Sequence, residues 1–281
     1  MITGKEQNTV YISSLLRTDP RFSDSYQRLI KILDKHHITH KYLKSTKDIW
    51  SRDYMPIQID QDRFVQFRYE PSYLIDDLEH QADPKIVCKE NNINPQFSNI
   101  NLDGGNIVNW SDRAIITDRV FDENPSYLNK IRLIKEIEKL LEVEVIIIPQ
   151  INIDLTGHAD GLVRFVNRNT LIGNNRDQEF LYWKKKMNRI LLDHNIQYID
   201  VPFLIHKDKK HPYSAIGCYL NLLEVGNLII IPVFDIPGNK DEEVFNLLKN
   251  VYQDRIVETI NYNGIGLFGG LLNCTTWTIK E

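Results

Sequence analysis

Apolar residues recur along the chain at two spacings, which predict strands alternating with helices. Short alternating or continuous apolar runs predict strands at residues 10–13, 63–69, 144–148 and 228–234. Apolar residues three and four positions apart predict amphipathic helices at 23–36, 125–141, 179–194 and 241–252. Leu128 and Ile131 are among the apolar positions of the second helix. No stretch rich in Pro, Gly and Ser divides the chain, so we expect one domain over residues 1–281.

Five short segments of similar character recur at residues 48–57, 101–108, 154–163, 218–223 and 269–275. Each carries a polar residue in a strand-like stretch: Asp53, Asp103, Asp160, Asn221 and Cys274. These residues are 50, 57, 61 and 53 positions apart, and a period of this size is typical of stacked or radially repeated units. Five units around an axis would bring one polar residue from each unit into a common centre. The repeat therefore predicts an α/β fold with pseudo-fivefold symmetry and a central site.

Composition excludes several classes of protein. A chain of 281 residues with 42% hydrophobic content can bury a full core. Its net charge of -4 argues against a nucleic-acid binder, which would normally carry a basic surplus. No apolar run approaches the ~20 residues of a membrane span, and the N-terminus lacks the apolar core of a secretory signal. Three widely spaced cysteines form no disulfide framework, so we expect a cytoplasmic protein.

Cys274 is the candidate nucleophile because it follows the Gly269-Gly270 turn. Glycines expose the backbone there and allow a substrate to approach closely. A nucleophilic thiolate needs a nearby base or a cation that lowers its pKa. Cys88 and Cys218 have no such surroundings, and we expect both to be inert buried thiols.

His158 is the candidate partner of the thiol, because Asp160 lies two residues further along. Positions i and i+2 of a strand face the same side, so the two side chains would line one wall of a pocket. The other histidines lack the spacing and partners of a metal site, and we expect none. A G-x-G-x-x-G match at 264–269 is followed by only twelve residues, too few for a dinucleotide unit. We therefore expect no cofactor.

Three acidic residues, Asp53, Asp103 and Asp160, complete the candidate site. Carboxylates that converge on one centre are costly to ionise together unless a cation compensates them. A guanidinium ion suits this role because its planar N–H fork matches a carboxylate. The residue types therefore favour a small guanidino compound as the partner.

The segments WSRDYMP (50–56), LDGGNI (102–107) and GHADG (157–161) resemble the agmatine deiminase and bacterial peptidylarginine deiminase family of the guanidino-modifying superfamily. Residues 219–221, 231–234 and 269–275 extend the likeness in the family's order. The resemblance implies the pentein fold, a five-bladed α/β propeller. It departs from the family at Met55, where Gly is usual, and at residues 271–273, which precede the cysteine in place of an Asn-Ile-His run. We therefore expect a changed pocket around the substrate tail.

The resemblance also implies a role for each matching residue. Cys274 would be the nucleophile, His158 the general acid and base, and Asp103 the acid that orients the histidine. Asp53 and Asp160 would grip the guanidinium ion. Asn221 and Trp50 would line the pocket.

The implied reaction is metal-free hydrolytic deimination, with agmatine as the expected substrate and N-carbamoylputrescine and ammonia as products. It would pass through a covalent thiouronium on the cysteine. The same chemistry on arginine, peptidyl-arginine or another small guanidine stays open. Free arginine would need a cation facing its carboxylate, for which Arg68, Arg113 and Arg164 are candidates. An amidinotransferase, a non-catalytic guanidinium-binding protein and a homo-oligomeric assembly also stay open.

Overall fold

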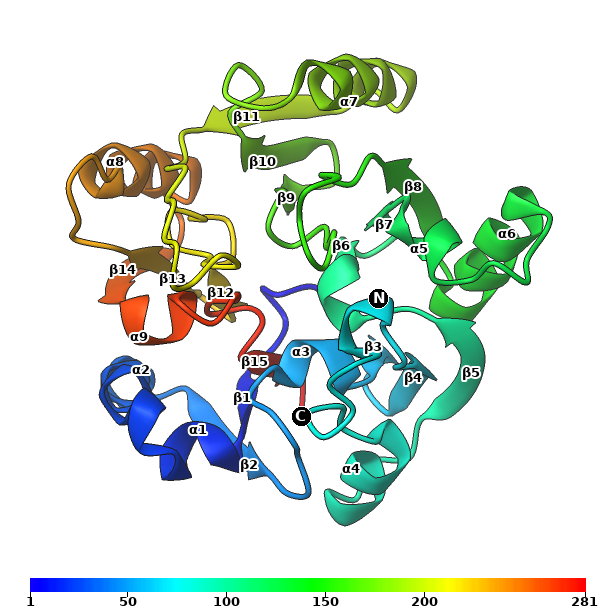
Figure 1. Cartoon of the computed structure of the whole chain (residues 1–281), viewed down its shortest axis with the longest axis horizontal. Coiled ribbons are helices and arrows are strands. Elements are labelled where there is room, and N and C mark those ends of the chain that lie inside the picture. The colour runs from blue at the N-terminus through cyan, green and yellow to red at the C-terminus, as the bar shows by residue number, and fades with distance from the viewer.

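The computed structural model describes residues 1–281 and contains five three-stranded sheets arranged around one axis (Figure 1). In every sheet the middle strand pairs antiparallel with the inner strand and parallel with the outer strand. The C-terminal strand β15 (Thr276–Ile279) pairs with the N-terminal strand β1 (Thr9–Ser13), so the two ends of the chain close the ring. This architecture confirms the predicted five-bladed α/β propeller.

The remaining strands follow chain order around the ring. The first sheet is completed by β2 (Thr39–Leu43), and the second contains β3 (Ile57–Asp60), β4 (Arg63–Arg68) and β5 (Gln96–Asn101). The third contains β6 (Val108–Asn109), β7 (Arg113–Thr117) and β8 (Glu144–Ile148). The fourth contains β9 (Val163–Asn167), β10 (Thr170–Asn174) and β11 (Gln197–Val201). The fifth contains β12 (Leu223–Val225), β13 (Leu228–Val233) and β14 (Ile256–Asn261).

Helices connect the parallel pair of each sheet, because parallel neighbours cannot be joined by a tight turn. These crossovers are α1 (Ser14–Thr18), η1 (Pro20–Phe22), α2 (Ser23–Lys35), η2 (Ser72–Leu74), α4 (Pro84–Glu90), α5 (Arg119–Asp122), α6 (Lys130–Leu141), α7 (Leu181–Asp193) and α8 (Asp241–Val251). Helices α2, α4, α6, α7 and α8 lie at the outer edge of the ring (Figure 1). Three short elements, α3 (Ser51–Tyr54), η3 (Gly104–Asn106) and α9 (Asn263–Gly266), lie instead between successive sheets. No helix is both long and apolar enough to cross a membrane.

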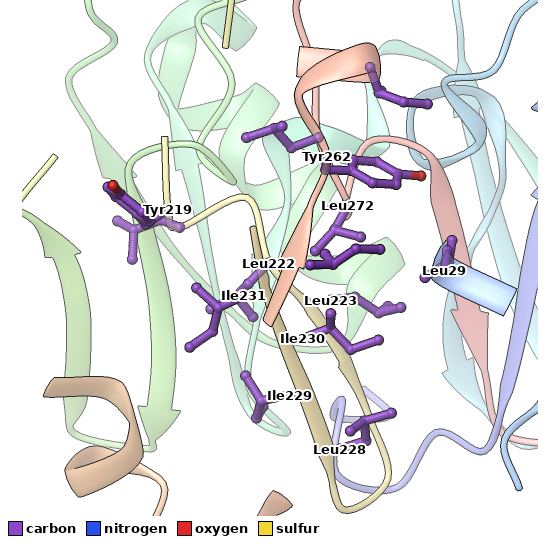
Figure 2. Packing of buried hydrophobic residues seen from close by; sticks show 14 of the residues in the cluster. Leu29, Tyr219, Leu222, Leu223, Leu228, Ile229, Ile230, Ile231, Tyr262 and Leu272 are labelled. Carbon is purple, nitrogen blue, oxygen red and sulfur yellow. The ribbon is translucent and has the colours of Figure 1, made fainter. Parts of the chain in front are cut away.

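The largest part of the hydrophobic core surrounds β13. Successive residues of this strand, from Leu228 to Ile231, point alternately to its two sides, and all are buried (Figure 2). A strand paired on both edges and covered on both faces needs apolar residues at every position, which explains its unbroken apolar run. Each such side chain contributes about 1.5–3 kcal/mol on burial. Helix α2 adds Leu29 and Leu33 to the same core.

The helix predicted at 125–141 begins later than the apolar pattern indicates. It starts at Lys130, because the Asn129 side chain accepts the Arg132 backbone N–H at 3.1 Å and so caps the first turn. Residues 125–129 form a turn. Leu128 and Ile131 are 98% and 70% exposed, so the prediction that they form part of an apolar face was wrong. The other strands and helices that were predicted agree with the structure within three residues at each end.

Candidate active site

The five segments that join one sheet to the next carry the candidate residues. Asp53 lies between β2 and β3, Asp103 between β5 and β6, and both His158 and Asp160 between β8 and β9. Asn221 precedes β12, and Cys274 precedes β15. Because each segment leads from the outer strand of one sheet to the inner strand of the next, the ring brings all of them to the axis. All six residues are buried and in contact with one another through the network described below.

His158, Asp53 and Asp103 form one half of the network, called here the imidazole cluster. His158 Nε2 is 2.8 Å from Asp103 Oδ2, and His158 Nδ1 is 3.6 Å from Asp53 Oδ1. Burial alone would lower the pKa of His158, but the charges of Asp53 and Asp103 outweigh it and raise the pKa to about 10. The raised pKa favours the protonated imidazole, which can donate a proton. Burial also raises the pKa of Asp53, to about 8, although the neighbouring imidazole acts to lower it.

Cys274, Asp160, Asn221 and Asn273 form the other half, the thiol cluster. Asn221 Nδ2 donates to Cys274 Sγ at 2.9 Å, and the thiol can donate to Asp160 Oδ2 at 3.7 Å. Asn221 Oδ1 accepts the backbone N–H of Asn273 and Cys274 at 2.9 and 3.2 Å, which fixes the turn that carries the sulfur. Burial, together with the charges of Asp160 and Asp53, raises the pKa of the Cys274 thiol well above its ordinary value.

The prediction that His158 and Asp160 lie on a strand and line one wall was wrong. They lie in a turn, in which the backbone N–H groups of Leu162 and Val163 donate to Ala159 O. The preceding Gly157 has a φ of +64°, which breaks the extended conformation. As a result His158 contacts Asp53 and Asp103, whereas Asp160 contacts Asn273 and Cys274.

Gly105 joins the two clusters through its backbone. Its N–H donates to Asp53 Oδ1 at 3.0 Å, and its carbonyl accepts the Asp160 N–H at 3.1 Å. A Cβ at this position would lie 2.5 Å from both Asp53 Oδ1 and His158 Nδ1, so only glycine fits. Each of the two acids thus has one carboxylate oxygen held by the protein, whereas no protein group donates to Asp53 Oδ2 or Asp160 Oδ1.

Trp50 and Arg52 attach the segment between β2 and β3 to the turn that carries Cys274. A Cβ on Gly270 would lie 2.5 Å from Trp50 Cζ3 and 3.0 Å from Cys274 Cβ, so the indole packs directly against this turn. The Arg52 N–H donates to Cys274 O at 3.1 Å, and its guanidinium donates to Thr278 Oγ1 at 3.2 Å. The predicted pocket residue Trp50 therefore packs against the turn that carries Cys274.

Two residues of the network had no role assigned from the sequence. The Tyr73 hydroxyl donates to Asp103 Oδ2 at 2.8 Å, the same oxygen that His158 contacts. Asn273 Nδ2 donates to Asp160 Oδ2 at 2.7 Å. Tyr73 lies in the short η2 turn and no sequence pattern marks it, whereas the position of Asn273 beside Cys274 was a visible signal.

The other two cysteines lie outside the network. Cys88 Sγ has Gln66 Oε1 as its polar neighbour at 3.9 Å, and Cys218 Sγ donates to Gly161 O at 3.4 Å. Burial raises the pKa of both thiols to about 12. Neither has a side-chain amide donor at its sulfur, in contrast to Cys274.

Comparison with known proteins identifies the family. The model of the Porphyromonas-type peptidyl-arginine deiminase family matches residues 5–279. The chain therefore belongs to the Porphyromonas-type peptidyl-arginine deiminase family. A comparison with curated proteins finds no match.

Solved structures share the fold at low sequence identity. Agmatine deiminase from C. jejuni with substrate bound has a TM-score of 0.83 and 17% identity, over 100% of this chain and 96% of that chain. Agmatine deiminase of Enterococcus faecalis has a TM-score of 0.78 and 15% identity, over 100% and 95% of the two chains. A dimethylarginine dimethylaminohydrolase adduct has a TM-score of 0.58 and 11% identity, over 97% and 99%. These likenesses show that the chain shares the fold of these proteins.

Proposed function

We propose that this protein, as one deiminase domain over residues 1–281, hydrolyses a guanidino group to a ureido group and ammonia. The observation that supports this most directly is the position of Asp160 between the sulfur and the amides of the thiol cluster, with Asp53 beside the imidazole. Each acid has a carboxylate oxygen without a protein donor. Two such oxygens suit the paired N–H groups of a guanidinium ion. Membership of a deiminase family and the folds of agmatine deiminases give independent support.

The reaction then proceeds through the two clusters. Asp53 and Asp160 hold the guanidinium ion with its carbon near Cys274 Sγ, which removes the cost of bringing the reactants together. The thiolate attacks this carbon and forms a C–S bond, and His158 protonates the departing nitrogen, which leaves as ammonia. Water, deprotonated by His158, attacks the thiouronium carbon. The C–S bond breaks, the thiolate is restored and a ureido product leaves.

Substrate binding also activates the nucleophile in this scheme. Burial and the charges of Asp160 and Asp53 keep the thiol protonated in the free protein, because they raise its pKa. A guanidinium ion between these acids neutralises their field at Cys274 Sγ and so lowers the pKa of the thiol, whose proton is released to water as the substrate binds. The Asn221 amide, 2.9 Å from the sulfur, stabilises the thiolate once it forms. The proposed reaction needs no metal and no other cofactor.

Agmatine is the substrate we favour. Free arginine would need a cation facing its carboxylate, and each of the three candidate arginines has other partners. Arg68 pairs with Glu70, Arg113 with Glu144, and Arg164 donates to the carbonyls of Leu220 and Leu222. None of them contacts a residue of the two clusters. A substrate without a carboxylate on its tail fits these pairings better.

The decisive assay measures ammonia and ureido product from agmatine, free arginine and an arginine-containing peptide. We expect turnover of agmatine in chelator-containing buffer, and loss of turnover in Cys274→Ser. The matched control is Cys88→Ser, which changes a buried thiol outside the network and should keep the activity. Turnover of the peptide or of free arginine instead would reassign the substrate. Failure to act on any guanidine, by folded protein, would overturn the proposed activity.

A further inference from the structure

Asn273 is a buried residue whose side chain makes the shortest contact to Asp160, the acid of the thiol cluster. It is 5% exposed, and its Nδ2 donates to Asp160 Oδ2 at 2.7 Å. Asn221 Nδ2 donates to the same oxygen at 3.2 Å. Asp160 Oδ2 thus receives two amide N–H groups, whereas no protein group donates to Oδ1. The carboxylate is held by one of its two oxygens.

This arrangement fixes the rotation of the carboxylate plane. With Oδ2 turned toward the two amides, Oδ1 is the oxygen left to accept an N–H group of a cation. The amides are neutral, so they orient Asp160 without cancelling its charge. A cationic donor at the same place would compete with the substrate for the carboxylate.

We propose that Asn273 is a positioning residue that sets Asp160 for capture of an amidinium or guanidinium group next to Cys274. The inference rests on the proposed function for the class of ligand, since a guanidinium is what the carboxylate would receive. Asn273 acts through Asp160 and not on the sulfur, which Asn221 contacts. Removal of the Asn273 amide should therefore weaken recognition of the cation and leave the intrinsic reactivity of the thiol in place.

A merely structural role for Asn273 predicts a different outcome. Its backbone N–H donates to Asn221 Oδ1 and helps to fix the nucleophile turn. If the side chain served only this turn, its loss would displace Cys274. Neutral and cationic reagents would then react more slowly by the same factor. The ratio of the two rates separates the two roles.

The experiment measures alkylation of Cys274 by 2-chloroacetamidine and by 2-chloroacetamide. The two reagents share size and leaving group, and the first carries an amidinium cation in place of a neutral amide. We expect wild type to prefer the amidine, and Asn273→Ala to reduce the ratio of the two rates about tenfold. Asn273→Leu, which keeps the side-chain volume, should give the same loss. The matched control is Asn174→Ala, because Asn174 Nδ2 also donates to a carboxylate, Glu179 Oε1 at 3.0 Å, outside both clusters.

A double variant shows whether Asn273 acts through Asp160. In an Asp160→Asn background the Asn273→Ala change should not lower the ratio further, because residues that act as one unit are not additive. An unchanged ratio in folded Asn273→Ala, or a full additional loss in the double variant, would overturn the inference. Labelling requires no turnover. If the protein prefers the amidine and Asn273→Ala loses this preference, the inference about Asn273 is supported even when no guanidine is hydrolysed. If the protein hydrolyses a guanidine but the ratio is unchanged in Asn273→Ala, the inference is rejected and the proposed function stands.

Discussion

The imidazole cluster and the thiol cluster lie side by side at the axis of the propeller, yet they balance charge in opposite ways. In the imidazole cluster the His158 cation lies between two carboxylates, at 2.8 and 3.6 Å. In the thiol cluster the Asp160 carboxylate has only neutral donors, namely the amides of Asn221 and Asn273 and the Cys274 thiol. The first cluster contains a cation in contact with its acids, whereas no cation contacts Asp160, although the buried Arg52 guanidinium lies near enough to act on it electrostatically. The difference indicates where a cationic substrate would be accepted.

In the free protein the shifted pKa values favour the protonated form of both His158 and Cys274. Neighbouring carboxylates raise the pKa of His158 to about 10 despite its burial. Burial and carboxylate charge raise the pKa of Cys274 well above its ordinary value. These shifts favour the pair of thiol and imidazolium, which is the wrong state for attack but the right one for protonation of a leaving amine. A guanidinium ion bound between Asp53 and Asp160 would lower the pKa of the thiol and so favour the thiolate that attack requires.

The largest expected effect comes from removing the cation of the imidazole cluster. His158→Gln should lower kcat about 10⁴-fold, because it deletes the only acid and base of the proposed mechanism. The measurement is the steady-state rate of ureido product formation. The matched control is His36→Gln, since His36 also contacts a carboxylate, Glu258 Oε1 at 2.7 Å, outside both clusters.

Labelling of Cys274 by 2-chloroacetamide should persist in His158→Gln, which shows that the thiol cluster is intact. A kcat within tenfold of wild type in this variant would contradict the role of His158.

The next effect comes from removing the charge of the thiol cluster. Asp160→Asn should lower kcat/KM about 10³-fold, because one of the two carboxylates that hold the cation is lost. The same change should make the thiol more reactive toward a neutral reagent. The charge of Asp160 raises the pKa of Cys274, so its removal lowers that pKa and increases the thiolate fraction at neutral pH.

The pH dependence of alkylation by 2-chloroacetamide tests this sign. In wild-type protein without substrate the rate should be low at pH 7 and still rising above pH 9. In Asp160→Asn the whole curve should move to lower pH. A curve that stays in place, or moves to higher pH, would show that Asp160 does not control the thiol.

The fold was predictable from the sequence because the repeat and the apolar periodicities indicate the same architecture. A polar residue recurs in each of five segments, and the strands between them carry the continuous apolar runs that a covered sheet requires, as at Leu228 to Ile231. Apolar periodicity could not locate the start of α6. The helix begins where the Asn129 side chain caps its first turn, and the apolar pattern begins earlier in the sequence.

The site was predictable where the chemistry of a residue is evident from its neighbours, as for Cys274 beside glycines and His158 near Asp160. Tyr73 gave no such signal, because it reaches Asp103 from a single 3-10 turn thirty positions earlier. Asn273 was visible beside the nucleophile, but its role depends on a carboxylate 113 positions away in the chain. Contacts across the axis between separate sheets are set by the closure of the ring and not by local sequence.

The smallest expected effect tests whether Tyr73 adjusts the pKa of His158. The Tyr73 hydroxyl and His158 Nε2 both lie 2.8 Å from Asp103 Oδ2. Tyr73→Phe leaves His158 as the sole donor to this oxygen, so the carboxylate charge acts more strongly on the imidazolium and raises its pKa further. Proton transfer from His158 becomes less favourable, and we expect kcat to fall about 3- to 10-fold with little change in KM.

The pH–rate profile distinguishes this tuning from a loss of packing. In Tyr73→Phe the limb that reports deprotonation of His158 should move to higher pH, whereas a packing defect would lower the rate equally at every pH. The matched control is Tyr127→Phe, because the Tyr127 hydroxyl also donates to a carboxylate, Glu136 Oε2 at 2.7 Å, at the outer edge of the ring. A limb that moves to lower pH would mean that the tyrosine strengthens the hold of Asp103 on His158. Tyr73 and His158 would then be two donors that support each other at this oxygen, and not two donors that compete for it.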